Sequence, residues 1–370
     1  MIPFNKPCYV GSEEEVIKEA LQQTKLSGNG PFGKKCAEWL EQQLKCEKAL
    51  LTPSCTAALE MTALLIDAGP GDEIIMPSYT FVSTANAFAL RGASIRFVDV
   101  DPATMNVSPS AVKAAITSKT KAIVVVHYAG ISCDMDAVMD IARKETLWVI
   151  EDAAQALMST YKGKPLGAIG HFGTISFHET KNYTCGEGGA LIINDVDAVE
   201  RAEILQEKGT NRKQFFRGVV DKYSWRDIGS SYLLSDINAA YLSVQLQHAG
   251  QILTERMNCW DRYFEGLSDV DEIGIPFVPA SCKHNAHMFY IKTDEAQKLI
   301  AYLEERDILA VTHFVPLHTS HAGRKFGKMA GMDQHTSAES ERLVRLPLYY
   351  GMEEEAVDYV VNHVKNYFSA

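Results

Sequence analysis

A single lysine stands in a polar turn between two short apolar segments near the middle of the chain. Ile175–Phe177 and Ala190–Ile193 have the composition of buried strands, and the turn between them carries Lys181. Low-dielectric walls weaken the hold of a lysine on its proton, and a neutral amine is a nucleophile that reacts with aldehydes. Lys181 is therefore predicted to form a Schiff base. The alternative is an ordinary loop lysine whose ammonium group reaches water.

Two carboxylates upstream provide a partner for this lysine. Trp148–Ile150 reads as a buried strand that ends in Glu151 and Asp152. Open α/β sheets bind their ligands at the carboxyl ends of parallel strands. Asp152 in that position can keep a pyridinium nitrogen protonated, which makes pyridoxal phosphate an electron sink; alone, it would more often cap a helix. Together, Lys181 and Asp152 predict a pyridoxal phosphate site.

Strands and helices alternate through the first two thirds of the chain. Short apolar strands are predicted at Glu73–Met76, Ser94–Val98 and Ala122–His127, with helical segments between them. This pattern predicts an α/β fold with a mostly parallel sheet covered on both faces. Nearer the end, a helix is predicted at Ser337–Leu343, while Gly327–Met332 has no strong pattern and is predicted to be a mobile loop.

Several motifs in matching order carry a resemblance to a known family. They are Pro77–Phe81, Glu151–Gln155, Ser176–His178, Thr180–Asn182 and Gly186–Gly189. On these motifs the chain resembles the DegT/DnrJ/EryC1/StrS sugar aminotransferases. The resemblance implies an aspartate-aminotransferase-like fold (pyridoxal phosphate fold type I). A large domain, 1–250, would hold a seven-stranded sheet flanked by helices, and 251–370 would form a linking helix and a smaller α+β domain.

The resemblance also implies which residues contact the cofactor. Its phosphate would lie at the helix N-terminus near Cys55 and Thr56 and against Ser176, since free N–H groups there favour an anion. Phe81 would stack on the pyridine ring, and Gln155 would lie near the 3-hydroxyl group. Local capping or core packing is the alternative for each of these residues. One further expected cofactor contact, Ser231, replaces an asparagine that in relatives reaches the neighbouring subunit's phosphate.

A positive segment in this acidic chain is a candidate for binding the substrate. Residues 208–227 combine lysines and arginines with four aromatic side chains, which suits a nucleotide diphosphate, although charge runs are usually solvated faces. The resemblance places this segment across a dimer interface. It also places a glycine-rich turn and two C-terminal histidines near the site. The candidate substrate residues are Gly28, Asn29, Arg212, Arg217, His313 and His318.

The resemblance implies a specific reaction and assembly. A homodimer with shared active sites, or a larger oligomer, would transfer the amino group of L-glutamate to the 4-keto carbon of TDP-4-keto-6-deoxyglucose. The products would be 2-oxoglutarate and TDP-4-amino-4,6-dideoxygalactose, a sugar used in enterobacterial common antigen. Alternatives are C3 or C4 amination of another nucleotide sugar, such as a UDP-linked one, and a cofactor-binding regulator without turnover. Related dehydratases carry histidine in place of Lys181, so this lysine favours amino transfer.

Composition excludes several other classes of protein. The net charge of −11 argues against nucleic acid and anionic membranes as partners, because both bind basic surfaces. We find no signal peptide and no membrane-length apolar run. The eight cysteines are scattered, which predicts reduced thiols in the cytoplasm and neither a disulfide framework nor a metal site.

Overall fold

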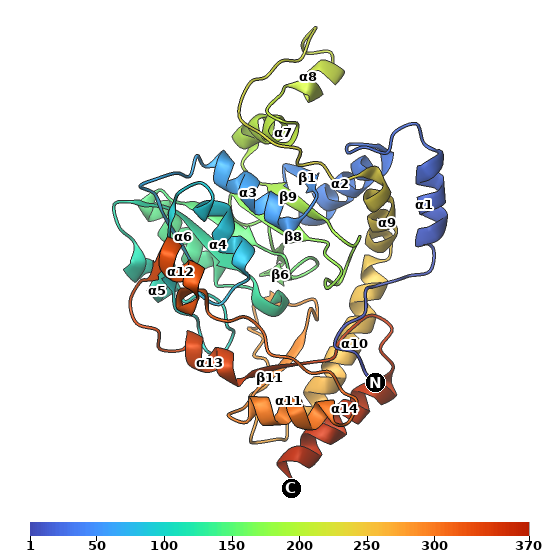
Figure 1. Ribbon diagram of the computed structural model, residues 1–370, viewed down its shortest axis with the longest axis vertical. Coiled ribbons are helices and arrows are strands. Elements are labelled where there is room, and N and C mark those ends of the chain that lie inside the picture. The colour runs from blue at the N-terminus through green and yellow to red at the C-terminus, as the bar shows by residue number, and fades with distance from the viewer. Residues whose placement is uncertain (370) are drawn as a thin grey trace.

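The computed structural model describes residues 1–369 and is built around one large sheet (Figure 1). Its strand order is β1-β9-β8-β5-β4-β2-β3-β12, and within it only β9 runs antiparallel to the other strands. The strands are β1 (Lys48–Thr52), β2 (Glu73–Pro77), β3 (Ser94–Val98), β4 (Thr120–Val126), β5 (Trp148–Asp152), β8 (Phe172–Ser176), β9 (Gly189–Ile193) and β12 (Gly327–Met329).

Helices cover both faces of this sheet, as the near-continuous apolar strands predict. Because side chains alternate along a strand, neighbours such as Ile74 and Ile75 belong to different cores on opposite faces. One core is completed by α1 (Glu13–Gln22), α2 (Pro31–Leu44), α5 (Pro109–Ala115), α6 (Met135–Glu145) and α9 (Asp236–Gln247). The other is completed by α3 (Cys55–Leu65), α4 (Val82–Ala89) and α7 (Val199–Gln206).

The C-terminal part of the chain has a core of its own. Strands β11 (Phe289–Lys292) and β13 (Leu343–Leu346) pair antiparallel. They pack with α10 (Ala249–Leu267), α11 (Ala296–Glu304) and α14 (Glu354–Phe368). The N-terminal segment runs along this part, since Ile2 forms a β-bridge with Ile308.

Short elements complete the structure. Helix α8 (Arg212–Phe216) lies in a hairpin that projects from the body of the molecule (Figure 1). The others are β6 (Thr160–Tyr161), β7 (Lys164–Pro165), β10 (Cys282–Lys283), α12 (His321–Phe326), α13 (Thr336–Arg342) and three 3-10 turns at Tyr128–Gly130, Val196–Ala198 and Leu317–Thr319. No helix within residues 1–369 combines the length and apolar character needed to cross a membrane.

Two predictions for the C-terminal third are corrected by the structure. The segment predicted to be a loop, Gly327–Met332, begins with β12, which pairs parallel to β3 and makes the sheet eight-stranded instead of seven-stranded. Gly327 allows this close approach, because a Cβ there would lie 2.6 Å from the carbonyl oxygen of Ile95. The helix predicted at Ser337–Leu343 ends at Arg342, and β13 follows it directly.

A buried carboxylate at the end of β5 fixes the turn that leads into β8. Glu151 has no exposed surface and accepts a hydrogen bond from Nε2 of His127 at 2.8 Å. Three backbone N–H groups also donate to this carboxylate, from Gly167 (2.8 Å), Ile169 (2.7 Å) and Gly170 (2.6 Å). Although burial opposes ionisation, these four donors hold the pKa of Glu151 below its usual range. Glu151 therefore has a structural role, and its neighbour Asp152 is left for the site.

The replacement Glu151→Ala is expected to lower the free energy of unfolding by about 3–5 kcal/mol, because it leaves buried donors without an acceptor. Urea unfolding followed by circular dichroism measures this. Glu145→Ala, at an exposed position at the end of α6, is the control and should change stability by less than about 0.5 kcal/mol. Equal stability of the two variants would contradict this role of Glu151.

Candidate active site

The site forms where β5 and β8 end side by side. Asp152 pairs in register with Thr174, so the last residues of both strands, Asp152 and Ser176, lie at one edge of the sheet. The N-terminus of α3 lies at the same edge. A Cβ on Gly189, at the start of β9, would lie 2.4 Å from the backbone nitrogen of Cys55, so only glycine allows this packing.

A cavity of about 450 Å³ opens at this edge. It is lined by both residues that the sequence singled out for chemistry, Asp152 and Lys181. Half of the other residues predicted to contact cofactor or substrate line the same cavity, namely Cys55, Thr56, Phe81, Gln155, Ser176 and His313. Residues from distant parts of the chain thus meet at one place.

Asp152 is held in position by two donors. The hydroxyl of Thr84 donates to Oδ2 at 2.7 Å, and the backbone N–H of Ala154 donates to Oδ1 at 3.2 Å. Thr84, itself fully buried, comes from α4 and also bonds Thr80 at 2.8 Å. Burial raises the pKa of Asp152, and the hydrogen bond from Thr84 is the strongest of the effects that oppose this rise.

Lys181 lies in the tight turn between β8 and β9. The backbone N–H of Lys181 donates to the carbonyl of His178 at 2.9 Å. Phe177 closes the base of the turn through backbone hydrogen bonds with Gly188 and Cys185. Burial is the main cause that lowers the pKa of Lys181, and the charge of Asp152 opposes this effect. An amine with a lowered pKa can act as a nucleophile and as a proton carrier.

The first turn of α3 supplies donors for an anion. Ser54 caps the helix by accepting from the N–H of Ala57 at 3.1 Å. Within residues 1–369, the N–H groups of Cys55 and Thr56 have no acceptor. The hydroxyl of Thr56 lies 2.7 Å from that of Ser83, and both line the cavity. Free N–H groups, hydroxyls and the helix dipole together suit a phosphate group.

Aromatic, amide and imidazole groups form another part of the cavity wall. Phe81 is 57% exposed and lies beside Phe314, with ring centroids 6.1 Å apart. Gln155 accepts the N–H of Ala129 at 2.7 Å, which leaves its NH₂ group as the donor end. His313 lies 2.8 Å from the hydroxyl of Tyr128, and burial holds the pKa of this histidine well below its usual value. His313 is therefore neutral.

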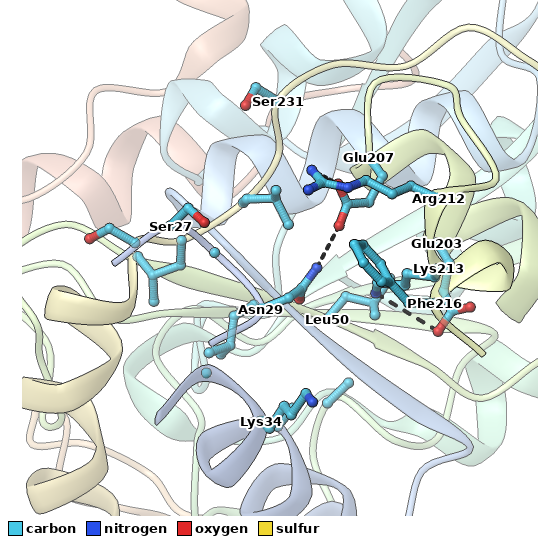
Figure 2. A pocket seen from close by; sticks show the side chains of 18 of the residues that line it. Ser27, Asn29, Lys34, Leu50, Glu203, Glu207, Arg212, Lys213, Phe216 and Ser231 are labelled. Carbon is cyan, nitrogen blue, oxygen red and sulfur yellow. Dashed lines mark hydrogen bonds and ion pairs between the residues drawn. The ribbon is translucent and has the colours of Figure 1, made fainter. Parts of the chain in front are cut away.

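Four predicted substrate residues and one predicted cofactor contact, Ser231, line a second, separate cavity of about 800 Å³, shown in Figure 2. It holds Gly28, Asn29, Arg212, Arg217 and Ser231. Within one chain, the structure does not bring these residues together with Lys181. The second cavity lies between α2, the edge strand β1 and the α7–α8 segment.

Carboxylates of the same chain neutralise much of the positive charge in this second cavity. Arg217 makes a bidentate ion pair with Glu203, at 2.8 and 2.6 Å. Arg212 lies 3.9 Å from Glu207, which also accepts the Asn29 amide at 2.8 Å (Figure 2). The arginines are thus less free to meet a diphosphate than the sequence suggests.

His318 lines neither cavity. Its Nδ1 lies 2.6 Å from the hydroxyl of Ser78, and its Nε2 lies 3.1 Å from Asp333. These contacts tie the segment after Phe314 to the end of β2. The sequence prediction that His318 faces the substrate is therefore not supported by its position.

Among the residues that sequence reasoning missed, Ser83 and Arg345 line the cavity, and Thr84 donates to Asp152 without lining it. Thr84 follows Thr80 by four residues, which is the spacing of neighbours on one helix face. Arg345 interrupts an apolar run, Leu343–Leu346. An isolated arginine inside a buried strand is the signal that could have drawn attention to it.

Comparisons with known proteins agree with this geometry. Residues 7–365 match the model of the DegT/DnrJ/EryC1/StrS aminotransferase family, and the chain belongs to that family. The chain is 31% identical to the spore coat polysaccharide biosynthesis protein SpsC of Bacillus subtilis, over 99% of this chain and 96% of that protein.

Solved structures share the whole fold. The aminotransferase TlmJ of Streptoalloteichus hindustanus superposes with a TM-score of 0.92 at 29% identity, covering 100% of this chain and 99% of that one. Spr1654 of Streptococcus pneumoniae, solved in a PLP-form, gives 0.89 at 26% identity and covers 100% and 98%. The protein is a pyridoxal phosphate-dependent sugar aminotransferase with the fold type I architecture.

Thr84→Val is expected to weaken binding of pyridoxal phosphate by roughly tenfold or more, because Asp152 loses a donor to its charged form. The pKa of Asp152 then rises further, so the defect should be larger near about pH 6 than near about pH 8. Absorbance titrations of the cofactor-free protein measure this. Thr84→Ser keeps the hydroxyl and should bind as the parent does; an unchanged affinity in Thr84→Val across this range would contradict the role of Thr84.

Proposed function

We propose that the protein transfers the amino group of L-glutamate to the 4-keto carbon of TDP-4-keto-6-deoxyglucose and forms TDP-4-amino-4,6-dideoxygalactose and 2-oxoglutarate. The observation that carries the amino-transfer chemistry is the cavity that Lys181 and Asp152 share with the first turn of α3. The choice of acceptor rests on the resemblance of the sequence motifs. The name of the Bacillus subtilis relative supports a product used in a surface polysaccharide.

The residues present fit the cofactor at each of its polar groups. We propose that the N–H groups of Cys55 and Thr56, with the Ser176 hydroxyl, bind the phosphate. Phe81 would cover one face of the ring, and the Gln155 amide would donate to the 3-hydroxyl group. Pyridoxal phosphate, when bound, supplies an electron-withdrawing ring that stabilises negative charge on the reacting carbon.

Asp152 and Lys181 have complementary tasks in this proposal. The Asp152 carboxylate would accept a hydrogen bond from the protonated ring nitrogen and so keep the proton there. Lys181 removes the proton from the α-carbon of the amino donor and, in the second half of the reaction, delivers a proton to C4 of the sugar. This requires an amine that is neutral part of the time, and burial of Lys181 provides it.

Exposed aromatic side chains beside the second cavity support the proposal of a homodimer with shared sites. The hairpin that bears α8 exposes Phe216 (69%), Tyr223 (52%) and Trp225 (81%), and a second copy of the chain would cover such a surface. We propose that Ser231 and Arg212 of this hairpin region contact the cofactor and nucleotide bound in the other subunit. We further propose that 1–250 and 251–370 are the two domains, and that the enzyme works in the cytoplasm.

Lys181→Ala is expected to lower amino transfer by at least about a thousandfold, because the proton carrier is lost. Turnover with L-glutamate and the keto sugar measures this. The control is Lys162→Ala, which removes an exposed lysine paired with Asp136 and should keep full activity. Full turnover by Lys181→Ala would rule out the mechanism.

The acceptor is tested with a panel of keto-deoxy sugars linked to TDP or UDP, with the product configuration determined by NMR. The proposal expects the highest kcat/KM for TDP-4-keto-6-deoxyglucose and a galacto product. Preference for a UDP-linked sugar, or amination at C3, would replace this acceptor while keeping the chemistry. Amino transfer without any nucleotide sugar would overturn the proposed function.

A further inference from the structure

A second cationic side chain faces the cofactor cavity. Among the described residues, Lys181 and Arg345 are the only lysine and arginine that line it. Lys181 has a chemical task in the proposed reaction, and Arg345 has none so far. Arg345 lies on β13, in the C-terminal part of the chain, and so approaches the cavity from the side opposite the large sheet.

Backbone and side-chain contacts hold Arg345 in one orientation. Its backbone N–H and carbonyl both bond Val311, at 2.8 and 3.1 Å. Its Nε and Nη2 both donate to the carbonyl of Thr312, at 3.2 and 3.1 Å. The guanidinium also lies over the ring of Phe4, 4.6 Å from its centroid. These contacts use one edge and one face of the guanidinium.

The other edge of the guanidinium is free. Nη1 has no acceptor, and no carboxylate of residues 1–369 lies within 4.0 Å of Arg345. By contrast, Arg262 pairs with Asp358, and the fully buried Arg256 donates to three carbonyl groups. A fixed fork of N–H donors, formed by Nη1 and Nη2, fits the two oxygens of a carboxylate.

The surroundings make an anion at this edge favourable. Arg345 is partly buried, and this burial lowers its pKa. The charge of Arg345 also lowers the pKa values of Lys181 and of the neutral His313. A carboxylate bound here would therefore replace lost hydration and would lie near the amine that moves the proton.

We propose that Arg345 binds the carboxylate of the amino donor through its Nη1–Nη2 edge and so sets the α-carbon of the donor against Lys181. This inference rests on the proposed function, since it assigns one of its two substrates. The keto sugar carries no carboxylate at its reacting end. Arg345 is therefore a specificity residue for the donor half of the reaction and is dispensable for the acceptor half.

Two variants and a matched control test the proposal. Arg345→Gln removes the charge, and Arg345→Lys keeps the charge but loses the fork. Arg342→Gln changes an arginine three positions away that pairs with Asp294 and Glu339 outside the cavity. Thermal unfolding and circular dichroism establish that each variant is folded. Arg345→Lys keeps the test decisive if Arg345→Gln does not fold.

The two half-reactions are then measured separately by absorbance. Enzyme loaded with pyridoxal phosphate is mixed with L-glutamate, and enzyme loaded with pyridoxamine phosphate is mixed with the keto sugar. For the Arg345 variants we expect kcat/KM of the donor half to fall roughly 100-fold, mainly through KM, because a charge-assisted pair is lost. The acceptor half should change less than about threefold, and Arg342→Gln should affect neither half.

Binding of glutarate, a dicarboxylate without an amino group, supplies a readout that needs no turnover. Calorimetry should show glutarate binding to the parent, and at least about 30-fold weaker binding to both Arg345 variants. Equal losses in both half-reactions, a loss in the acceptor half alone, or unchanged glutarate affinity would each overturn the proposal. Loss in the acceptor half alone would assign Arg345 to the nucleotide diphosphate. If no sugar is aminated, the proposed function fails, while the glutarate result still decides the role of Arg345.

Discussion

The structure depends on burying an amine and a carboxylate in the same cavity. Burial drives both groups toward their neutral forms, lowering the pKa of Lys181 and raising that of Asp152. The proposed reaction needs the lowered pKa of Lys181, but it also needs Asp152 to stay charged. Hydrogen bonds from Thr84 and Ala154 favour the charged form of Asp152, whereas burial is the largest effect on Lys181 and outweighs the nearby groups that favour its ammonium form.

The alternation of side chains along β5 separates stability from chemistry. Glu151 and Asp152 are adjacent in sequence, so they point to opposite faces of the sheet. Glu151 is enclosed by four donors and fixes the turn before β8, whereas Asp152 faces the cavity. The residue on one face of the strand end thus fixes the surrounding backbone, and the residue on the other face lines the cavity.

Much of the fold was predictable because buried parallel strands carry a strong apolar pattern. The predicted strand Ser94–Val98 matches β3, and the predicted turn between β8 and β9 holds Lys181. The strand β12 was not predictable, because Gly327–Met329 gains its stability from pairing with a distant edge and not from its own composition. Long-range pairing of this kind leaves no local signal in a short segment.

The candidate site was predictable to the extent that its residues follow strands or open helices. Asp152, Ser176 and Cys55 are of this kind, and the cavity brings them together. Arg345 lines the cavity from β13 and Thr84 bonds Asp152 from α4, and the sequence does not reveal that these elements meet there. Arg212 and Ser231 lie in a separate cavity, and the composition of their segment does not reveal which cavity they line.

The most direct test of the account is to reduce the protein loaded with pyridoxal phosphate with borohydride and to map the modified residue by mass spectrometry. The account predicts a stoichiometric pyridoxyl phosphate group on Lys181 and loss of the near-visible absorbance on reduction. Modification of a different lysine, or no modification of a protein that binds the cofactor, would contradict the central role of Lys181.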